Sequence, residues 1–180
     1  HETGTRDLRK LSGLYRFMPI SATLAMVAAA AMAGVPLMNG FLSKEMFLAE
    51  ALADHQGTFI DETLPYLATL ASAFSVLYSL RFIHQSFFGP PPRDLPHQPH
   101  EAPPWMRLPI EILVLACLLA GIAPNLTIAP FLANAAQSVI GERMPHYSLA
   151  VWHGFTLPLA KSLIALGSGT LGKLLFRDRL

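Results

Sequence analysis

The sequence predicts an all-α, polytopic integral membrane helical bundle of about four transmembrane helices, the first of them discontinuous. Three observations lead to this fold class. Of the 180 residues, 52% are hydrophobic. Only 14% are charged, whereas a soluble domain usually carries about 25% charged residues. The apolar residues also gather in runs of about 20 or more, the length that a helix needs to cross a bilayer.

The composition excludes several classes of function. A net charge of +1 gives no bulk electrostatic attraction to nucleic acid, so no nucleic-acid partner is expected. Cys117 is the only cysteine, which excludes an internal disulfide and a cysteine-based metal cluster. We expect no metal, no redox cofactor and no enzymatic activity. Because the chain opens on a polar stretch at His1 without a signal-peptide pattern, we expect a piece of a longer protein.

The first predicted span covers residues 19–53, after a polar and basic lead-in of 17 residues. Pro19 suits the first turn of a helix, where its missing N–H is not needed. The apolar stretch is too long for one perpendicular crossing. Pro36 removes a backbone hydrogen bond from its middle, and Gly40 permits dihedral angles that other residues avoid. We therefore expect a broken helix, a feature that often brackets ion sites in transporters.

Lys44 follows this predicted break, and a lysine inside the membrane is a candidate functional residue. It would load and release a proton, with Glu45 as its partner. The alternative is an ordinary interfacial lysine. A straight helix from Pro19 would place Lys44 about 37 Å along its axis at 1.5 Å per residue, beyond the hydrocarbon core of about 30 Å. The residues alone divide these interpretations evenly.

Three further spans are expected, at residues 64–84, 108–130 and 148–172. Seven prolines among residues 90–104 predict an extended loop over residues 88–107. Nine loop cations fall on one side of this arrangement, and by the positive-inside rule both ends of the fragment then face the cytoplasm. These cations are Arg6, Arg9, Lys10, Arg16, Arg93, Arg107, Lys173, Arg177 and Arg179.

Three other polar residues are candidates for a proton or ion pathway. Arg81 either tunes a buried carboxylate or lysine, or extends from a helix end to the membrane surface. His153 either relays protons, because its pKa lies near neutrality, or packs beside an interfacial tryptophan. Lys161 falls near the middle of the fourth span, where a charged lysine costs about 2.5–3.5 kcal/mol. It should therefore face protein or water.

The segment Pro36–Glu45 resembles the broken-helix motif of proton-translocating antiporter-like subunits. That group includes the large A-type subunit of Mrp-type (Mnh, Pha) monovalent cation/proton antiporters and the L-type subunit (subunit 5) of NADH–quinone oxidoreductase. In the family, the lysine of the Gly-Phe-x-Ser-Lys motif ends a proton path to the outer face. The resemblance implies this role for Lys44. The family pattern is apolar at the position of Lys161, so this charged residue departs from it.

Similarity to the antiporter branch extends over nearly the whole chain. The stretches that carry it are His1–Asp7, Leu11–Leu14, Trp152–Phe155 and Pro158-Leu159, and a further stretch, Ser79–Phe82 with Phe87–Gly89, resembles both branches. The resemblance implies one subunit of a multisubunit antiporter in the bacterial cytoplasmic (inner) membrane, partnered by other membrane subunits. Such an antiporter would exchange protons for Na+ or K+. The resemblance does not identify which of the two cations is transported.

Three alternatives remain open. The oxidoreductase subunit would drive the same proton chemistry by electron transfer in its complex. A non-transporting assembly module would keep cation resistance intact after Lys44→Ala. A soluble helical bundle, the least favoured class, would be extracted into aqueous buffer without detergent.

Overall fold

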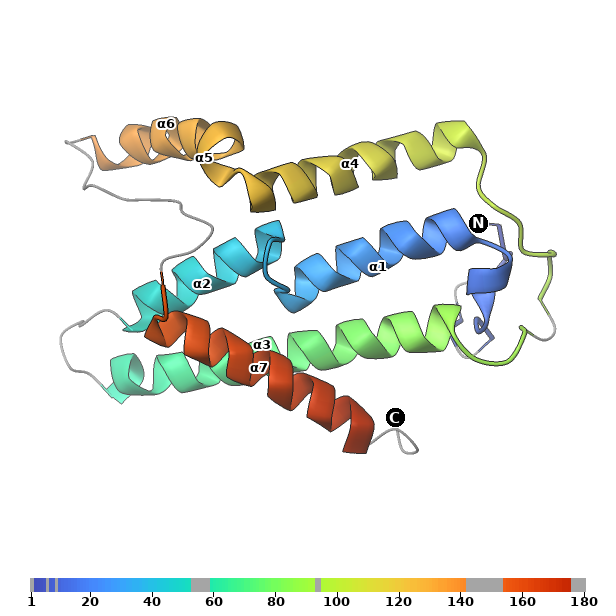
Figure 1. The fold of residues 1–180 in the computed structure, drawn as a ribbon, viewed down its shortest axis with the longest axis horizontal. Coiled ribbons are helices and arrows are strands. Elements are labelled where there is room, and N and C mark those ends of the chain that lie inside the picture. Colours follow the sequence, from blue (N-terminus) through green and yellow to red (C-terminus); the bar gives the residue numbers. More distant parts are fainter. Residues whose placement is uncertain are drawn as a thin grey trace.

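The first predicted span is the central element of the fold, and it consists of two helices. In the computed structural model, α1 (Pro19–Ala33) and α2 (Asn39–Leu52) follow one another along the middle of an elongated bundle (Figure 1). The predicted break is present, because residues 34–38 are not helical. The residues that the structure describes are 2–5, 7–8, 10–52, 59–92, 95–141 and 154–175.

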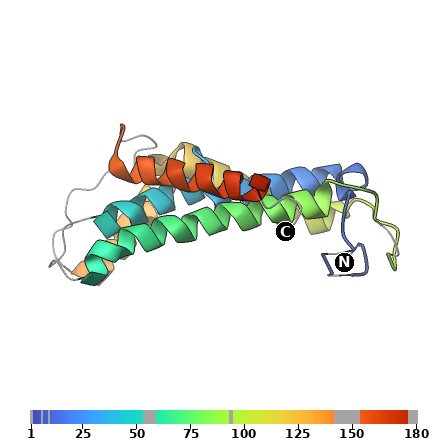
Figure 2. The ribbon, with the colours of Figure 1, turned by 90° about the horizontal axis from the view of Figure 1, so that it is seen from below.

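Three longer helices surround this broken pair. The α3 helix (Phe59–Phe87) runs back along both α1 and α2, and α4 (Pro104–Ile122) contacts both from another side. The α7 helix (Leu157–Leu175) packs on α2 and crosses α3 obliquely (Figures 1 and 2). The break therefore lies beside α3 and α4, which contact its backbone, while the side chains of Pro36 and Leu37 are exposed.

The helices differ in extent from the predicted spans. The second predicted span, residues 64–84, lies within α3, which extends beyond it at both ends. The third begins at Pro104 rather than 108, because this proline starts a helix well, and the loop therefore ends before 107. It stops at Ile122 rather than 130, since Pro124 interrupts it. Two short helices follow, α5 (Pro124–Thr127) and α6 (Ala129–Ile140).

Only part of the fourth predicted span, residues 148–172, is described. The α7 helix starts at Leu157, not at residue 148, and residues 142–153 lie outside the described part of the chain. Within the described residues, two segments are long and apolar enough to cross a membrane, Glu62–Phe87 and Pro104–Ile122. The apolar α1 helix has 15 residues, too few to span a bilayer alone. Four spans thus remain a prediction.

A close helix contact joins α3 and α7. A Cβ added to Gly169 of α7 would lie 2.6 Å from the Cβ of Val76 and 2.7 Å from the Ala73 carbonyl oxygen. Val76 is 2% exposed, so this contact is fully shielded. Small residues at such crossings allow close backbone approach, which stabilises helix pairs in lipid.

A carboxylate from the proline-rich loop closes the start of α1. Glu101 accepts hydrogen bonds from the backbone N–H groups of Ile20 and Ser21, both at 3.0 Å, and from the Ser21 hydroxyl. The first N–H groups of a helix have no partner within the helix, and anions are favoured there. Burial raises the pKa of Glu101, but these hydrogen bonds and nearby Arg107 outweigh it and hold the pKa below its ordinary value.

We expect Glu101→Ala to lower the stability of the parent protein by about 1 kcal/mol, the usual contribution of a helix cap. Because the folded-state pKa of Glu101 is lowered, the cap contributes fully above the ordinary carboxyl pKa. Its contribution is lost as pH falls through the lowered value. Thermal unfolding of the detergent-solubilised protein at pH 7 and near pH 3 measures both effects. Glu111→Ala, which removes an exposed partner of Arg107, is the control, and equal losses from both variants would contradict the assignment.

Candidate functional site

The α1 helix ends at a glycine in the left-handed conformation. Gly34 has φ +80° and donates its N–H to the Ala31 carbonyl at 3.1 Å. Val35 donates to the Ala30 carbonyl at 3.0 Å, and this pair of bonds is the Schellman pattern of helix ends. Pro36 follows and cannot continue the helix. The sequence Gly-Val-Pro thus accounts for the termination of α1.

Side chains satisfy the two remaining carbonyls of α1. The Met32 carbonyl accepts a hydrogen bond from Ser75 Oγ of α3 at 2.9 Å. The Ala33 carbonyl accepts one from Lys44 Nζ at 3.0 Å. The last four C=O groups of a helix have no partner within the helix, so Ser75 and Lys44 complete this end. The predicted pathway lysine is therefore directed back at the break that precedes it.

Two glycines make this geometry possible. A Cβ added to Gly34 would lie 2.8 Å from Lys44 Cδ, so the missing side chain leaves room for the lysine stem. At Gly40, an added Cβ would overlap the Ala31 carbonyl oxygen. The first turn of α2 therefore lies against the last turn of α1. This overlap of the two helix ends brings Lys44 within reach of Ala33.

Glu45 points to a different neighbour. It is 7% exposed, and its carboxylate accepts a long hydrogen bond from Thr156 Oγ1 at 3.4 Å. Thr156 directly precedes α7 and also accepts the backbone N–H of Leu159. Anions are favoured at such helix N-termini. Adjacent helix positions face different directions, so Lys44 contacts α1 and Glu45 contacts the start of α7. Direct pairing of the two stays a prediction.

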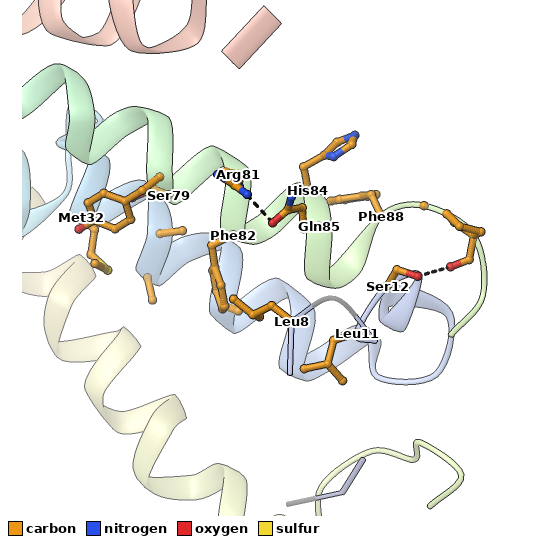
Figure 3. A pocket seen from close by; sticks show the side chains of 16 residues that line it. Leu8, Leu11, Ser12, Met32, Ser79, Arg81, Phe82, His84, Gln85 and Phe88 are labelled. Atoms are coloured by element: carbon orange, nitrogen blue, oxygen red, sulfur yellow. Dashed lines mark hydrogen bonds between the residues drawn. The ribbon is translucent and has the colours of Figure 1, made fainter. Parts of the chain in front are cut away.

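Arg81 lies in another part of the structure. It lines an apolar pocket of about 1020 Å³ between the N-terminal segment, α1 and α3, and neither Lys44 nor Glu45 is among the lining residues. Its Nε donates to Gln85 Oε1 at 3.2 Å, as Figure 3 shows. Met32, whose carbonyl belongs to the break, lines the same pocket. The described contacts of Arg81 therefore connect it to a neutral amide, and its predicted role in tuning a charged group stays a prediction.

Lys161 and His153 complete the set of predicted residues. The ammonium of Lys161 lies 4.4 Å from the ring centroid of Tyr66 on α3, a cation–π contact. This contact gives the lysine a protein partner, as its position in an apolar helix requires. His153 lies outside the described residues. Among the residues that are described, no group of three or more His, Cys, Asp or Glu side chains is arranged to hold a metal ion.

Sequence reasoning missed the partners of these residues. Ser75 gave no signal, because a single serine in an apolar helix does not show which group it faces. Thr156 precedes a helix, and Tyr66 gave no signal because a single aromatic residue is common in apolar helices. A serine or threonine that faces a helix end is recognisable only when the two helices are known to be neighbours.

Comparisons with known proteins agree with the broken-helix motif. A family profile described as the transmembrane part of NADH:quinone oxidoreductase and Mrp antiporters matches residues 1–80. A probable K(+)/H(+) antiporter subunit of type A/B from Rhizobium meliloti is 62% identical over 94% of the chain. The A-type subunit of the Na(+)/H(+) antiporter of Bacillus subtilis is 37% identical over 97% of the chain. These relatives are transport subunits and not enzymes.

The chain is similar to the A-type subunits of Mrp antiporters. One chain of the solved Mrp complex from a Dietzia species matches it with a TM-score of 0.77 and 30% identity, over 98% of this chain. The chain spans only a small part of the length of these relatives, namely 17% of the Rhizobium protein, 23% of the Bacillus protein and 18% of the Dietzia chain. The part of the chain that the structure describes is all-α.

We expect Lys161 and Tyr66 to stabilise the protein jointly. Lys161→Met or Tyr66→Leu should each lower stability by about 0.5–1 kcal/mol, because each removes the same cation–π contact. The double variant should lose less than the sum of the two. Denaturant unfolding of the solubilised parent protein measures this coupling. Lys173→Met, a lysine at the end of the same helix, should combine additively with Tyr66→Leu, and additivity for Lys161 would refute the contact.

Proposed function

We propose that the chain forms part of the proton path of a multisubunit monovalent cation/proton antiporter, with Lys44 as a proton relay. The observation that carries this proposal is the hydrogen bond from Lys44 Nζ to the Ala33 carbonyl at the helix break. The C-terminal end of a helix attracts a cation, whereas removal from water disfavours charge. The amine is held between these opposing influences, as a group that exchanges protons requires.

The break itself supports this role. Irregular backbone at membrane depth is tolerated where protein or a water-filled cavity surrounds it. When Lys44 gives up its proton, the attraction of the amine for the end of α1 weakens, and the side chain is released toward other acceptors. Pro36 and Gly40 serve this cycle indirectly, since they create the helix end and the close overlap that Lys44 uses.

The other predicted residues have supporting roles in this proposal. Glu45 is a buried carboxylate adjacent to the relay, and Arg81 extends polar character into the pocket between α1 and α3. Lys161 lies on α7, which packs on both α2 and α3. His153 completes the proposed pathway by its position in the sequence. The transported ions would be protons and Na+ or K+, and the exchange would depend on the other membrane subunits.

We further propose that four spans cross the bacterial cytoplasmic membrane, with α1 and α2 together forming the first. The start of α1, the end of α3 and the start of α4 lie at one end of the bundle (Figure 1). That end carries the basic lead-in and the proline-rich loop, so it would face the cytoplasm. The opposite end, with α6 and the start of α7, would face outward.

The antiporter branch is favoured over the oxidoreductase branch. The family profile covers both, but the Rhizobium and Bacillus relatives, which resemble the chain along nearly its whole length, are antiporter subunits. Electron transfer in an oxidoreductase complex would be an alternative driving force for the same lysine chemistry. Proton transport that requires Na+ or K+ and no electron donor distinguishes the two.

Replacing Lys44 by alanine in the full-length protein should reduce antiport to background, because the alanine side chain cannot take up a proton at the break. Cation-dependent proton movement in everted membrane vesicles and cation resistance of an antiporter-deficient host measure the loss. Lys10→Ala, at an exposed lysine of the lead-in, should leave antiport unchanged. Full activity of Lys44→Ala in an assembled complex would refute the relay and favour a non-transporting assembly module.

Cysteines introduced at the two ends should report the orientation. Gln98→Cys in the proline-rich loop and Ser138→Cys in α6 both replace exposed side chains. A membrane-impermeant thiol reagent should label only the Ser138→Cys variant in intact spheroplasts and only the Gln98→Cys variant in everted vesicles. The unsubstituted protein, with Cys117 alone, is the control. The reverse labelling pattern would overturn the proposed orientation.

A further inference from the structure

The α4 helix touches the connection between α1 and α2 at two points one helical turn apart. Cys117 Sγ donates a hydrogen bond to Asn39 Oδ1 at 2.9 Å, and Asn39 is the first residue of α2. Gly121 is buried against the connection. A Cβ there would lie 2.7 Å from the Met38 Cα and carbonyl carbon, and would overlap the Leu37 carbonyl oxygen. One face of α4 thus packs directly on backbone.

The connection that α4 contacts adopts an unfavourable conformation. Leu37 has φ +69°, the one non-glycine residue with positive φ in the described part of the chain. For a residue with a side chain, this conformation is unfavourable because the Cβ crowds the following carbonyl oxygen. Such conformations persist where the surrounding structure imposes them. The neighbouring backbone hydrogen bond from Met38 to Val35, at 3.2 Å, closes the turn from within, and α4 supplies the contacts from outside.

The position of this connection sets the position of Lys44. Lys44 lies five residues after Asn39 on the same helix, so a shift or rotation of the first turn of α2 moves its amine relative to the Ala33 carbonyl. The 3.0 Å contact between Lys44 Nζ and Ala33 tolerates little displacement, since hydrogen bonds weaken quickly with distance and angle. Nothing in α4 needs to touch Lys44 for this effect.

We propose that Cys117 and Gly121 are positioning residues, through which α4 holds the Leu37–Asn39 connection and thereby aims Lys44 at the end of α1. This inference rests on the proposed relay function of Lys44. Cys117 supplies a hydrogen-bond donor to Asn39, and Gly121 supplies space for the Leu37 and Met38 backbone. The role of α4 therefore goes beyond that of an apolar membrane span.

The test uses variants of the full-length protein in its assembled complex, assayed by cation-dependent proton transport in everted vesicles. Gly121→Ala should reduce the rate per assembled complex several-fold and displace the pH profile, because the added methyl group pushes the connection away from α4. Gly167→Ala is the matched control, since a Cβ at this helical glycine meets nothing within 4 Å. It should match the unsubstituted protein in rate and pH profile.

Cys117 provides the second arm, which decides the outcome if Gly121→Ala does not assemble. Cys117→Ala removes the donor to Asn39 and should shift the pH profile and lower the rate. Cys117→Ser keeps a donor and should restore both. A merely structural role would change the amount of complex and not the pH profile. The charged residues on α2 and its neighbouring helices stay unchanged throughout: Lys44, Glu45, Glu50, Asp61, Glu62, Arg81, His84, Arg107, Glu111, Lys161 and Lys173.

The outcomes separate this inference from the function on which it rests. If Lys44→Ala abolishes antiport while Cys117→Ala, and Gly121→Ala where it assembles, keep the normal rate and pH profile, the positioning role is wrong and the relay stands. If Lys44→Ala retains antiport, the relay itself is wrong. The positioning role is supported if Lys44→Ala abolishes antiport, Cys117→Ala lowers the rate and shifts the pH profile, and Cys117→Ser restores both.

Discussion

The end of α1 must satisfy its carbonyl groups within a bundle of apolar helices, and this constraint organises the centre of the structure. Four carbonyls are left without helical partners wherever a helix stops. Here two are satisfied by the backbone turn at Gly34 and Val35, and two by the side chains of Ser75 and Lys44. A single set of hydrogen bonds therefore both ends the helix and holds Lys44 in place.

Each neighbouring helix contributes to this centre in a chemically different way. The α3 helix supplies a hydroxyl donor in Ser75, and α4 supplies the space at Gly121 and a thiol donor in Cys117. The α7 helix presents Thr156 to Glu45. Apolar packing brings these helices together, but it does not fix their register. The polar contacts and the glycines select one arrangement, because an unmatched polar group would remain costly away from water.

The two lysines of the apolar helices illustrate two ways of keeping a charge there. Lys44 directs its amine to the end of a helix, where the peptide dipoles favour a cation. Lys161 lies over the face of Tyr66, where the quadrupole of the ring attracts a cation. The first environment depends on a break that a small movement of α2 would alter. The second is a contact between the sides of two helices, which is better suited to stabilising their packing than to exchanging protons.

The sequence by itself determined the all-α class and the helix break between α1 and α2. Apolar run length, Pro36 and Gly40 act locally, so their consequences are readable from neighbouring residues. Helix ends were less certain, as the late start at Leu157 and the stop before Pro124 illustrate. Local sequence permits a helix over several alternative ranges, and tertiary contacts select among them.

Only the tertiary structure decided what each polar side chain faces. Ser75, Tyr66 and Thr156 are separated from their partners by 43, 95 and 111 residues, and no sequence periodicity relates positions so far apart. The different contacts of Lys44 and Glu45 likewise follow from which helix covers each face of α2. Hydropathy specifies that a helix face is covered. The shape and hydrogen-bonding groups of the neighbouring helices specify which helix covers it.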